Sequence, residues 1–140
     1  MKQQHGQMIS GIALACSLLL ATPGAWAEDK KEDTTVYPAY LTLTPVVVNI
    51  ADANRARFLR VEIDLSIKTA EDAAIVHEHM PIIQDRLVVL LGGRDAQSLQ
   101  AAGARDTLRK ELLDALRDAM NKAAGHPAID DLYFTGFIIQ

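Results

Sequence analysis

The chain has 140 residues, of which 18 are acidic and 14 are basic, so its formal net charge is −4 at pH 7. A chain of this length supports one domain around one hydrophobic core, and its acidic balance argues against nucleic acid as a partner. Its only cysteine is Cys16. An internal disulfide is therefore excluded, and side-chain packing must hold the fold together.

The N-terminus is typical of a secretory signal peptide. Lys2 precedes an apolar run over 9–21, and a small-x-small triplet at 25–27 follows that run. The run has about 13 residues, whereas a helix needs about 20 to cross a bilayer. We therefore predict that residues 1–27 are removed and that the protein leaves the cytoplasm. An uncleaved N-terminal anchor and a lipid attached to Cys16 are the alternatives.

Two strands are expected after a charged linker. Residues 28–36 carry mostly charged side chains and little apolar surface, so we predict that they link the N-terminus to a domain over 37–140. The β-branched segment over 40–50 predicts a strand that is bent or bulged at Pro45, because proline cannot donate to a sheet ladder. Residues 59–67 alternate between apolar and polar side chains, which indicates a half-buried antiparallel strand.

A long helix is expected next. Thr69 occupies the N-cap position and Gly92-Gly93 follows the last apolar position, so the helix should begin and end there. Pro81 interrupts the pattern, which predicts a kink or a break into two helices. Apolar side chains recur every three or four residues along this segment and define a core-facing stripe, which consists of Ala73, Val76, Met80, Ile83, Leu87 and Leu90.

The last third of the chain predicts a second long helix and a final strand. A polar stretch with a short turn at 97–101 precedes a helix over 104–124 that has apolar residues on one face. Gly125 should end that helix. Residues 132–140 are rich in aromatic and β-branched side chains, which favour a strand. The order strand, strand, helix, helix, strand predicts an α+β fold, with a small antiparallel-dominated sheet and two long helices on one face.

No segment has the pattern of a catalytic, cofactor-binding or metal site. His77-Glu78-His79 comes nearest, but side chains two apart on a helix point about 200° apart, so the two imidazoles do not converge on one ion. Glu62 and Asp64 share a strand face with basic neighbours, which indicates an ordinary solvated surface. We therefore predict a non-enzymatic protein without cofactor or metal. A metal-dependent enzyme that uses His77 or His79 is the alternative.

The second half of the first long helix carries apolar side chains on more than one face. Besides the core stripe, Ile82, Val88, Val89 and Leu91 add a second apolar surface. The candidate interface for an oligomer or a partner consists of Ile82, Leu87, Val88, Val89 and Leu91. Burial of this surface under the second long helix is the alternative explanation.

Five segments carry a resemblance to a known family. In chain order they are 43–50 (LTPVVVNI), 57–61 (RFLRV), 80–87 (MPIIQDRL), 108–112 (LRKEL) and 132–140 (LYFTGFIIQ). Each segment is a weak signal by itself, whereas their order is fairly specific. Together they resemble the periplasmic domain of the flagellar basal-body-associated FliL family, over about 37–140.

The resemblance implies a stomatin-like fold and a non-enzymatic protein that forms a ring around the stator units of the flagellar motor and supports swimming or swarming. It implies a place in the periplasm, at the inner membrane or the basal body, with stator and basal-body proteins as partners. Members of this family usually begin with a transmembrane helix, whereas this chain has a signal-peptide-like N-terminus. A homo-oligomer, or a mixed ring with an anchored paralogue, follows from the resemblance. A generic periplasmic binding module unrelated to motility is the alternative.

Overall fold

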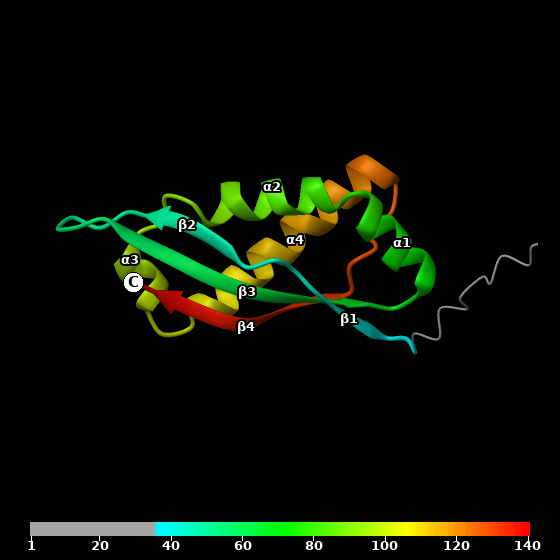
Figure 1. Cartoon of the computed structure of the whole chain (residues 1–140), viewed down its shortest axis with the longest axis horizontal. Helices are drawn as coiled ribbons and strands as arrows, with labels where there is room; N and C mark the ends of the chain where they lie inside the picture. Colours follow the sequence, from blue (N-terminus) through cyan, green and yellow to red (C-terminus); the bar gives the residue numbers. More distant parts are fainter. Residues whose placement is uncertain (1–35) are drawn as a thin grey trace, which may run out of the picture. The chain divides into compact units, whose positions relative to one another are not determined.

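The structure, a computed structural model, describes residues 36–140 (Figure 1). The predicted signal peptide over 1–27 and the predicted linker, apart from Val36, lie outside the described residues. The elements in chain order are β1 (Ala39–Thr42), β2 (Val46–Ile50), β3 (Arg57–Ile67), α1 (Ala70–Glu78), α2 (Met80–Leu91), α3 (Ala96–Gln100), α4 (Ala104–Ala124) and β4 (Asp131–Ile139). None of the helices in this part of the chain is long and apolar enough to cross a membrane.

β3 is the central strand of a four-stranded antiparallel sheet. β1 and β2 pair with one edge of β3, and β4 pairs with the other. Leu65 of β3, for example, lies between Leu41 of β1 and Leu132 of β4. The backbone groups of β3 are therefore used in both directions, as in the middle of a sheet.

A proline divides the segment that pairs with the β1 and β2 side of β3. The segment predicted as one strand over 40–50, bent or bulged at Pro45, is divided into two strands before that residue, because proline has no N–H to donate to the ladder. β1 and β2 are its two halves. Between them, the N–H of Leu43 donates to the carbonyl of Ile63 at 2.9 Å. Both halves therefore follow the same edge of β3.

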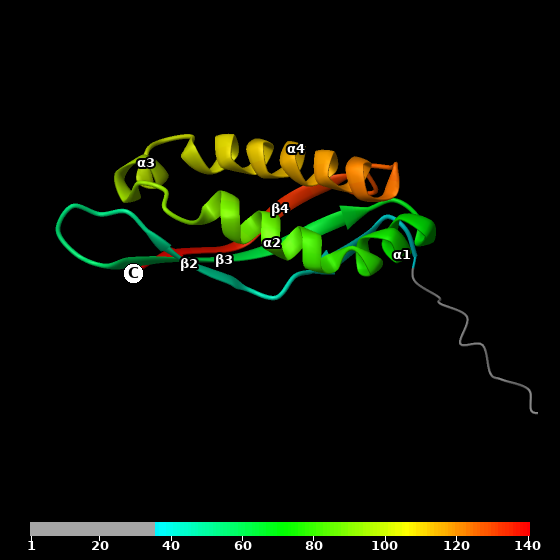
Figure 2. The same cartoon turned by 90° about the horizontal axis from the view of Figure 1, so that it is seen from above.

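The two long helices, α2 and α4, lie along one face of the sheet (Figures 1 and 2). Among other contacts, α2 packs against β2 and α4 packs against β4. The side chains of β3 that face these helices are buried, as the alternating pattern predicted. The largest fully buried side chains are Leu59, Val61, Ile63, Leu65, Ile67, Ile83, Leu87, Leu91, Leu112, Leu116, Met120 and Leu132. The predicted α+β fold is therefore confirmed.

The long helix expected after β3 divides into α1 and α2 at His79. Pro81 has no N–H to bond the carbonyl of His77, and it lies in the first turn of α2, where such a bond is not needed. Thr69 caps α1 as predicted, since its hydroxyl accepts the N–H of Asp72 at 3.1 Å. The proline therefore sets the boundary between the two helices.

Arg117 fixes α4 to the segment that leads into β4. Its Nε donates to the carbonyl of Ile129 at 2.9 Å, and a terminal guanidinium nitrogen donates to the carbonyl of Asp130. This segment lies between α4 and β4, outside any helix or strand. Backbone carbonyls that are shielded from water need a hydrogen-bond donor. In a sheet the neighbouring strand provides it; here Arg117 does.

We expect Arg117→Met to lower the free energy of unfolding by about 1–3 kcal/mol, because the half-buried carbonyls lose their donor. Lys122→Met is the matched control on the same helix. Lys122 makes an exposed ion pair with Asp118 at 2.7 Å, and its loss should cost less than about 0.5 kcal/mol. Urea unfolding followed by circular dichroism measures both values. Equal costs for the two variants would contradict the role given to Arg117.

Candidate functional site

The five residues of the candidate interface divide between two sides of α2. The side chains of Ile82, Val88 and Val89 are exposed, by 37%, 50% and 61% respectively. The side chains of Leu87 and Leu91 are fully buried. Leu87 and Leu91 therefore belong to the core and offer no surface to a partner.

The core stripe of α2 also differs in part from the predicted stripe. Ile83, Leu87 and Leu91 are buried, whereas Met80 and Leu90 are only half-buried and pack against the edge of the core. The fully buried residues of α2 thus recur every four residues, and the last of them is Leu91 rather than Leu90. The pattern alone did not decide this, because Leu90 and Leu91 are both apolar and lie about 100° apart on the helix.

The exposed apolar side chains of α2 form what we call the α2 patch: Ile82, Val88 and Val89. Ile82 and Val89 are separated by about two helical turns, so they lie on one ridge of α2. Asp85 and Arg86 are exposed on the same ridge between them. The patch therefore mixes aliphatic and charged side chains.

α4 does not cover the α2 patch. The two helices pack against each other, but α4 buries the inner side of α2, and the three patch residues keep their exposure. The alternative explanation, burial under the second long helix, therefore fails for Ile82, Val88 and Val89.

The outer face of the sheet, opposite the helices, carries further exposed apolar side chains. Val47 and Ile138 flank Arg60 on the neighbouring strands. Tyr40 and Tyr133 meet edge to face, with ring centroids 6.0 Å apart. The sequence did not reveal these clusters, because neighbours across strands depend on the pairing register.

The histidines of α1 and its C-terminal end do not form a site with each other. His77 is exposed, and Nδ1 of His79 lies 2.9 Å from the carbonyl oxygen of Ile75 in the same helix. Within residues 36–140, no group of three or more His, Cys, Asp or Glu side chains is placed to hold a metal ion.

The carboxylates of Glu62 and Asp64 lie on the outer face of β3. Glu62 pairs with Arg60 at 2.7 Å, and both side chains are partly exposed. Gly136 lies opposite Glu62 in β4, and a Cβ there would come within 2.9 Å of the Glu62 carboxylate. Glu62 therefore packs over the glycine on a mixed, partly exposed surface, as the sequence indicated, whereas one oxygen of the Asp64 carboxylate is buried without a hydrogen-bond partner.

A family model matches most of the chain. The model of the family described as Flagellar basal body-associated protein FliL matches residues 40–140. This match covers nearly all of the fold described above. The chain belongs to this family.

Individual relatives agree with the family match. The flagellar protein LafL of Vibrio parahaemolyticus is 26% identical over 110 residues, which cover 79% of this chain and 66% of that protein. The flagellar protein FliL of Escherichia coli K12 is 29% identical over 117 residues, which cover 81% and 73%. That of Aquifex aeolicus is 25% identical over 96 residues, which cover 69% and 57%. The chain thus matches between 57% and 73% of the length of these relatives.

The division of α2 into a buried and an exposed side can be tested with neighbouring residues. We expect Leu87→Ala to lower the free energy of unfolding by about 2–5 kcal/mol, because it leaves a cavity in the core. Val88→Ala should change it by less than about 0.5 kcal/mol, because that side chain is half exposed. Urea unfolding of the two variants distinguishes the faces. If Val88→Ala lowered the free energy of unfolding more than Leu87→Ala, the side of α2 that carries Val88 would be the one packed against the sheet, which would contradict this division.

Proposed function

We propose that this protein is a non-enzymatic accessory component of the bacterial flagellar basal body, which supports stator and motor function in swimming or swarming through protein contacts. The observation that carries the proposal is the family match over 40–140, which includes both long helices and nearly the whole sheet. The relatives are named as flagellar proteins, which supports the same assignment.

The proposed location is the periplasm, next to the inner membrane or the basal body. The short apolar run near the N-terminus supports export with removal of residues 1–27, a linker over 28–36 and a domain over 37–140. A protein without its own anchor would reach the motor through other proteins. Assembly as a homo-oligomer, or as a mixed ring with an anchored paralogue, provides such a route.

The α2 patch is the proposed contact surface for this assembly. Its three aliphatic side chains are exposed on the folded domain, and the charges of Asp85 and Arg86 between them add specificity to any contact. Permanent dimers usually bury large, mainly apolar interfaces. A patch of three aliphatic side chains with charges between them fits a reversible contact better.

A motility assay tests this proposal. We expect that deletion of the gene, in a strain that also lacks any second family member, reduces spreading in soft agar, and that the wild-type gene on a plasmid restores it. Val89→Lys should fail to restore full spreading, because a charge then replaces the most exposed aliphatic side chain of the α2 patch. Ala74→Lys is the matched control, since Ala74 is also exposed on a helix but lies outside the patch.

Two outcomes would count against the proposal. Unchanged swimming and swarming in the strain without any family member would argue against a role at the motor. Full rescue by Val89→Lys would leave the family assignment in place but remove the α2 patch from the contact surface. The unfolding free energies of Val89→Lys and Ala74→Lys must agree within about 0.5 kcal/mol, so that stability does not explain a difference between them.

A further inference from the structure

The two outer edges of the sheet are protected to different extents. Along the β2 edge, the connection between α2 and α3 bonds to the strand backbone: the N–H of Gly93 donates to the carbonyl of Asn49, and the N–H of Ala51 donates to that of Arg94, both at 2.8 Å. The N–H of Ala96 completes this pairing by donating to the carbonyl of Ala51 at 2.9 Å. Unpaired edges invite other strands, and these bonds occupy the 49–51 end of this edge.

Prolines protect the β1 part of the same edge. Pro38 precedes β1 and Pro45 separates β1 from β2. Proline cannot donate to an added strand, and it is one of the devices that keep natural sheet edges from pairing with other chains. None of these strands contains a proline, but β4, which forms the opposite edge, also has none directly beside either of its ends.

The first residues of β4 are occupied by a local ion pair. The Asp131 carboxylate accepts the N–H of Leu132 at 2.8 Å and pairs with Arg109 at 2.5 Å. Burial raises the pKa of Asp131, but the hydrogen bonds from Leu132 and the Tyr133 hydroxyl, together with the charge of Arg109, outweigh it and hold the pKa below its ordinary value. The carboxylate is therefore ionised near neutral pH, and this end of the edge has no free N–H at Leu132.

The last residues of β4 offer an unpaired edge. Phe58 and Gln140 exchange both of their backbone hydrogen bonds, at 2.9 Å each. Because such pairs alternate along an antiparallel ladder, the N–H and C=O of Ile138 point toward β3, and those of Phe137 and Ile139 point away from it. Within the described residues, no strand or loop pairs with that side of β4. We call the backbone of 136–140 the open edge.

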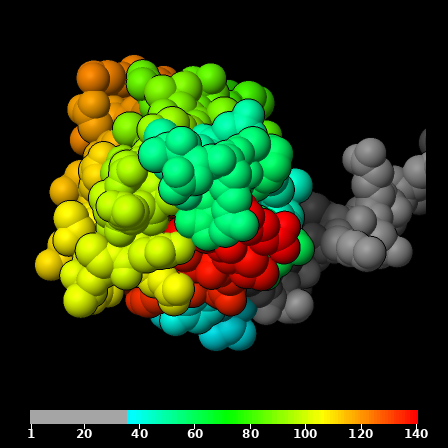
Figure 3. Space-filling view, turned by 90° about the vertical axis from the view of Figure 1, so that its left-hand side faces the viewer, coloured from blue at the N-terminus to red at the C-terminus, as the bar shows by residue number. Residues whose placement is uncertain are grey.

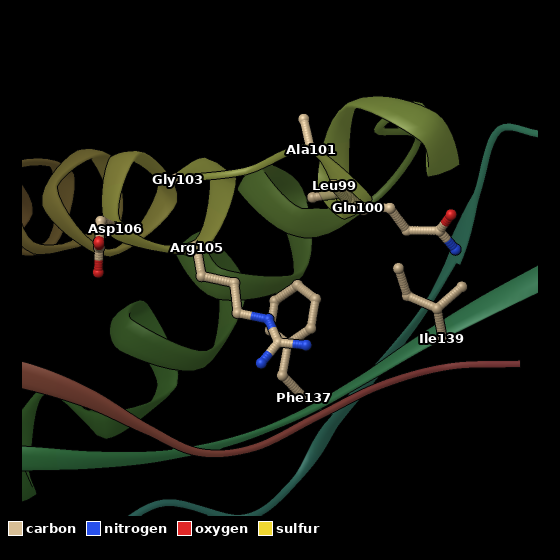
Figure 4. Close-up of a pocket in the computed structure, with 8 residues that line it drawn as sticks. All are labelled: Leu99, Gln100, Ala101, Gly103, Arg105, Asp106, Phe137 and Ile139. Atoms are coloured by element: carbon tan, nitrogen blue, oxygen red, sulfur yellow. The ribbon is translucent and has the colours of Figure 1, made fainter.

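A hollow lies beside the open edge, between the end of β4, α3 and the start of α4 (Figure 4). It has a volume of about 550 Å³, and Leu99, Gly103, Arg105, Phe137 and Ile139 are among the residues that line it. A second hollow of about 420 Å³ shares Arg105 and Phe137 and continues along β4. Figure 3 shows the end of β4 at the surface beside the α3–α4 region. An extended segment could therefore reach the open edge.

Arg105 places a positive charge directly beside the open edge. Its guanidinium carbon lies 4.8 Å from the centre of the Phe137 ring, and Figure 4 shows the side chain directed from α4 toward that ring. None of the ion pairs among the described residues involves Arg105. Asp106 also lines the hollow, but Figure 4 shows it farther along α4. A carboxylate placed over Phe137 would thus meet an unpaired guanidinium.

We propose that the open edge of β4 accepts an extended, acidic segment of a partner protein as an added strand. The backbone groups of Phe137 and Ile139 would form the ladder, and an acidic side chain of the segment would meet Arg105. A second copy of this chain fits less well. Antiparallel self-pairing centred on Phe137 would bring the two Arg105 side chains to the same side of the joined sheet, where like charges repel. The proposal does not depend on the flagellar assignment.

The test uses the full chain, labelled with ¹⁵N, and two synthetic peptides with blocked ends, Thr-Val-Glu-Val-Thr and Thr-Val-Lys-Val-Thr. We expect the acidic peptide to shift and protect the amide signals of Phe137 and Ile139, and to bind about three- to tenfold more tightly than the basic peptide. Arg105→Glu should reverse that preference. Lys110→Glu is the matched control, because it makes the same charge change on an exposed part of α4 outside both hollows.

A backbone-modified peptide separates strand addition from simple charge attraction. N-methylation of the amide that faces the open edge should weaken the acidic peptide by about three- to tenfold, because one ladder bond is lost. The proposal is overturned if neither peptide affects the Phe137 and Ile139 amides at millimolar concentration, or if Arg105→Glu leaves the preference unchanged. Protection of these amides that rises with protein concentration alone would assign the open edge to a second copy instead.

Discussion

β3 organises the whole domain, because it pairs with other strands on both edges and buries the side chains of its inward face from Leu59 to Ile67. Leu59, Val61 and Ile63 point toward the helices, and the polar residues between them face the opposite side. A shift of the pairing by one residue would expose this apolar row and bury the charged one, so the register has a single favourable solution. Once that register is set, the position of every other element relative to the sheet follows from its own apolar face.

Much of this arrangement could be predicted from local patterns. The alternation along β3, the N-cap at Thr69, the break near Pro81 and the end of α4 at Gly125 each depend on residues close together in the chain. What the sequence could not predict depends on contacts between distant residues. Neither the choice between Leu90 and Leu91 nor the pairing of Ala51 with the α2–α3 connection leaves a periodic signal.

The candidate interface shows the same division between local and distant information. An excess of apolar residues on α2 was visible in the sequence, but only packing against the sheet separates Leu87, which is buried, from Val88, which is exposed. Membership of the FliL family over 40–140 places the chain among flagellar basal body-associated proteins. The α2 patch and the open edge of β4 are the two surfaces of this domain that we propose for protein contacts.

The contrast between the paired segment 49–51 at one edge of the sheet and the open edge of β4 at the other is best measured by native-state hydrogen exchange of the full chain without any ligand. Amides that are hydrogen-bonded in the folded domain, such as those of Ala51, Ala96 and Ile138, should exchange slowly. Those of Phe137 and Ile139 should exchange much faster, even though they alternate with protected amides in the same strand. If Phe137 and Ile139 exchange as slowly as Ile138, this edge is already paired or covered, and the account of an open edge on β4 is contradicted.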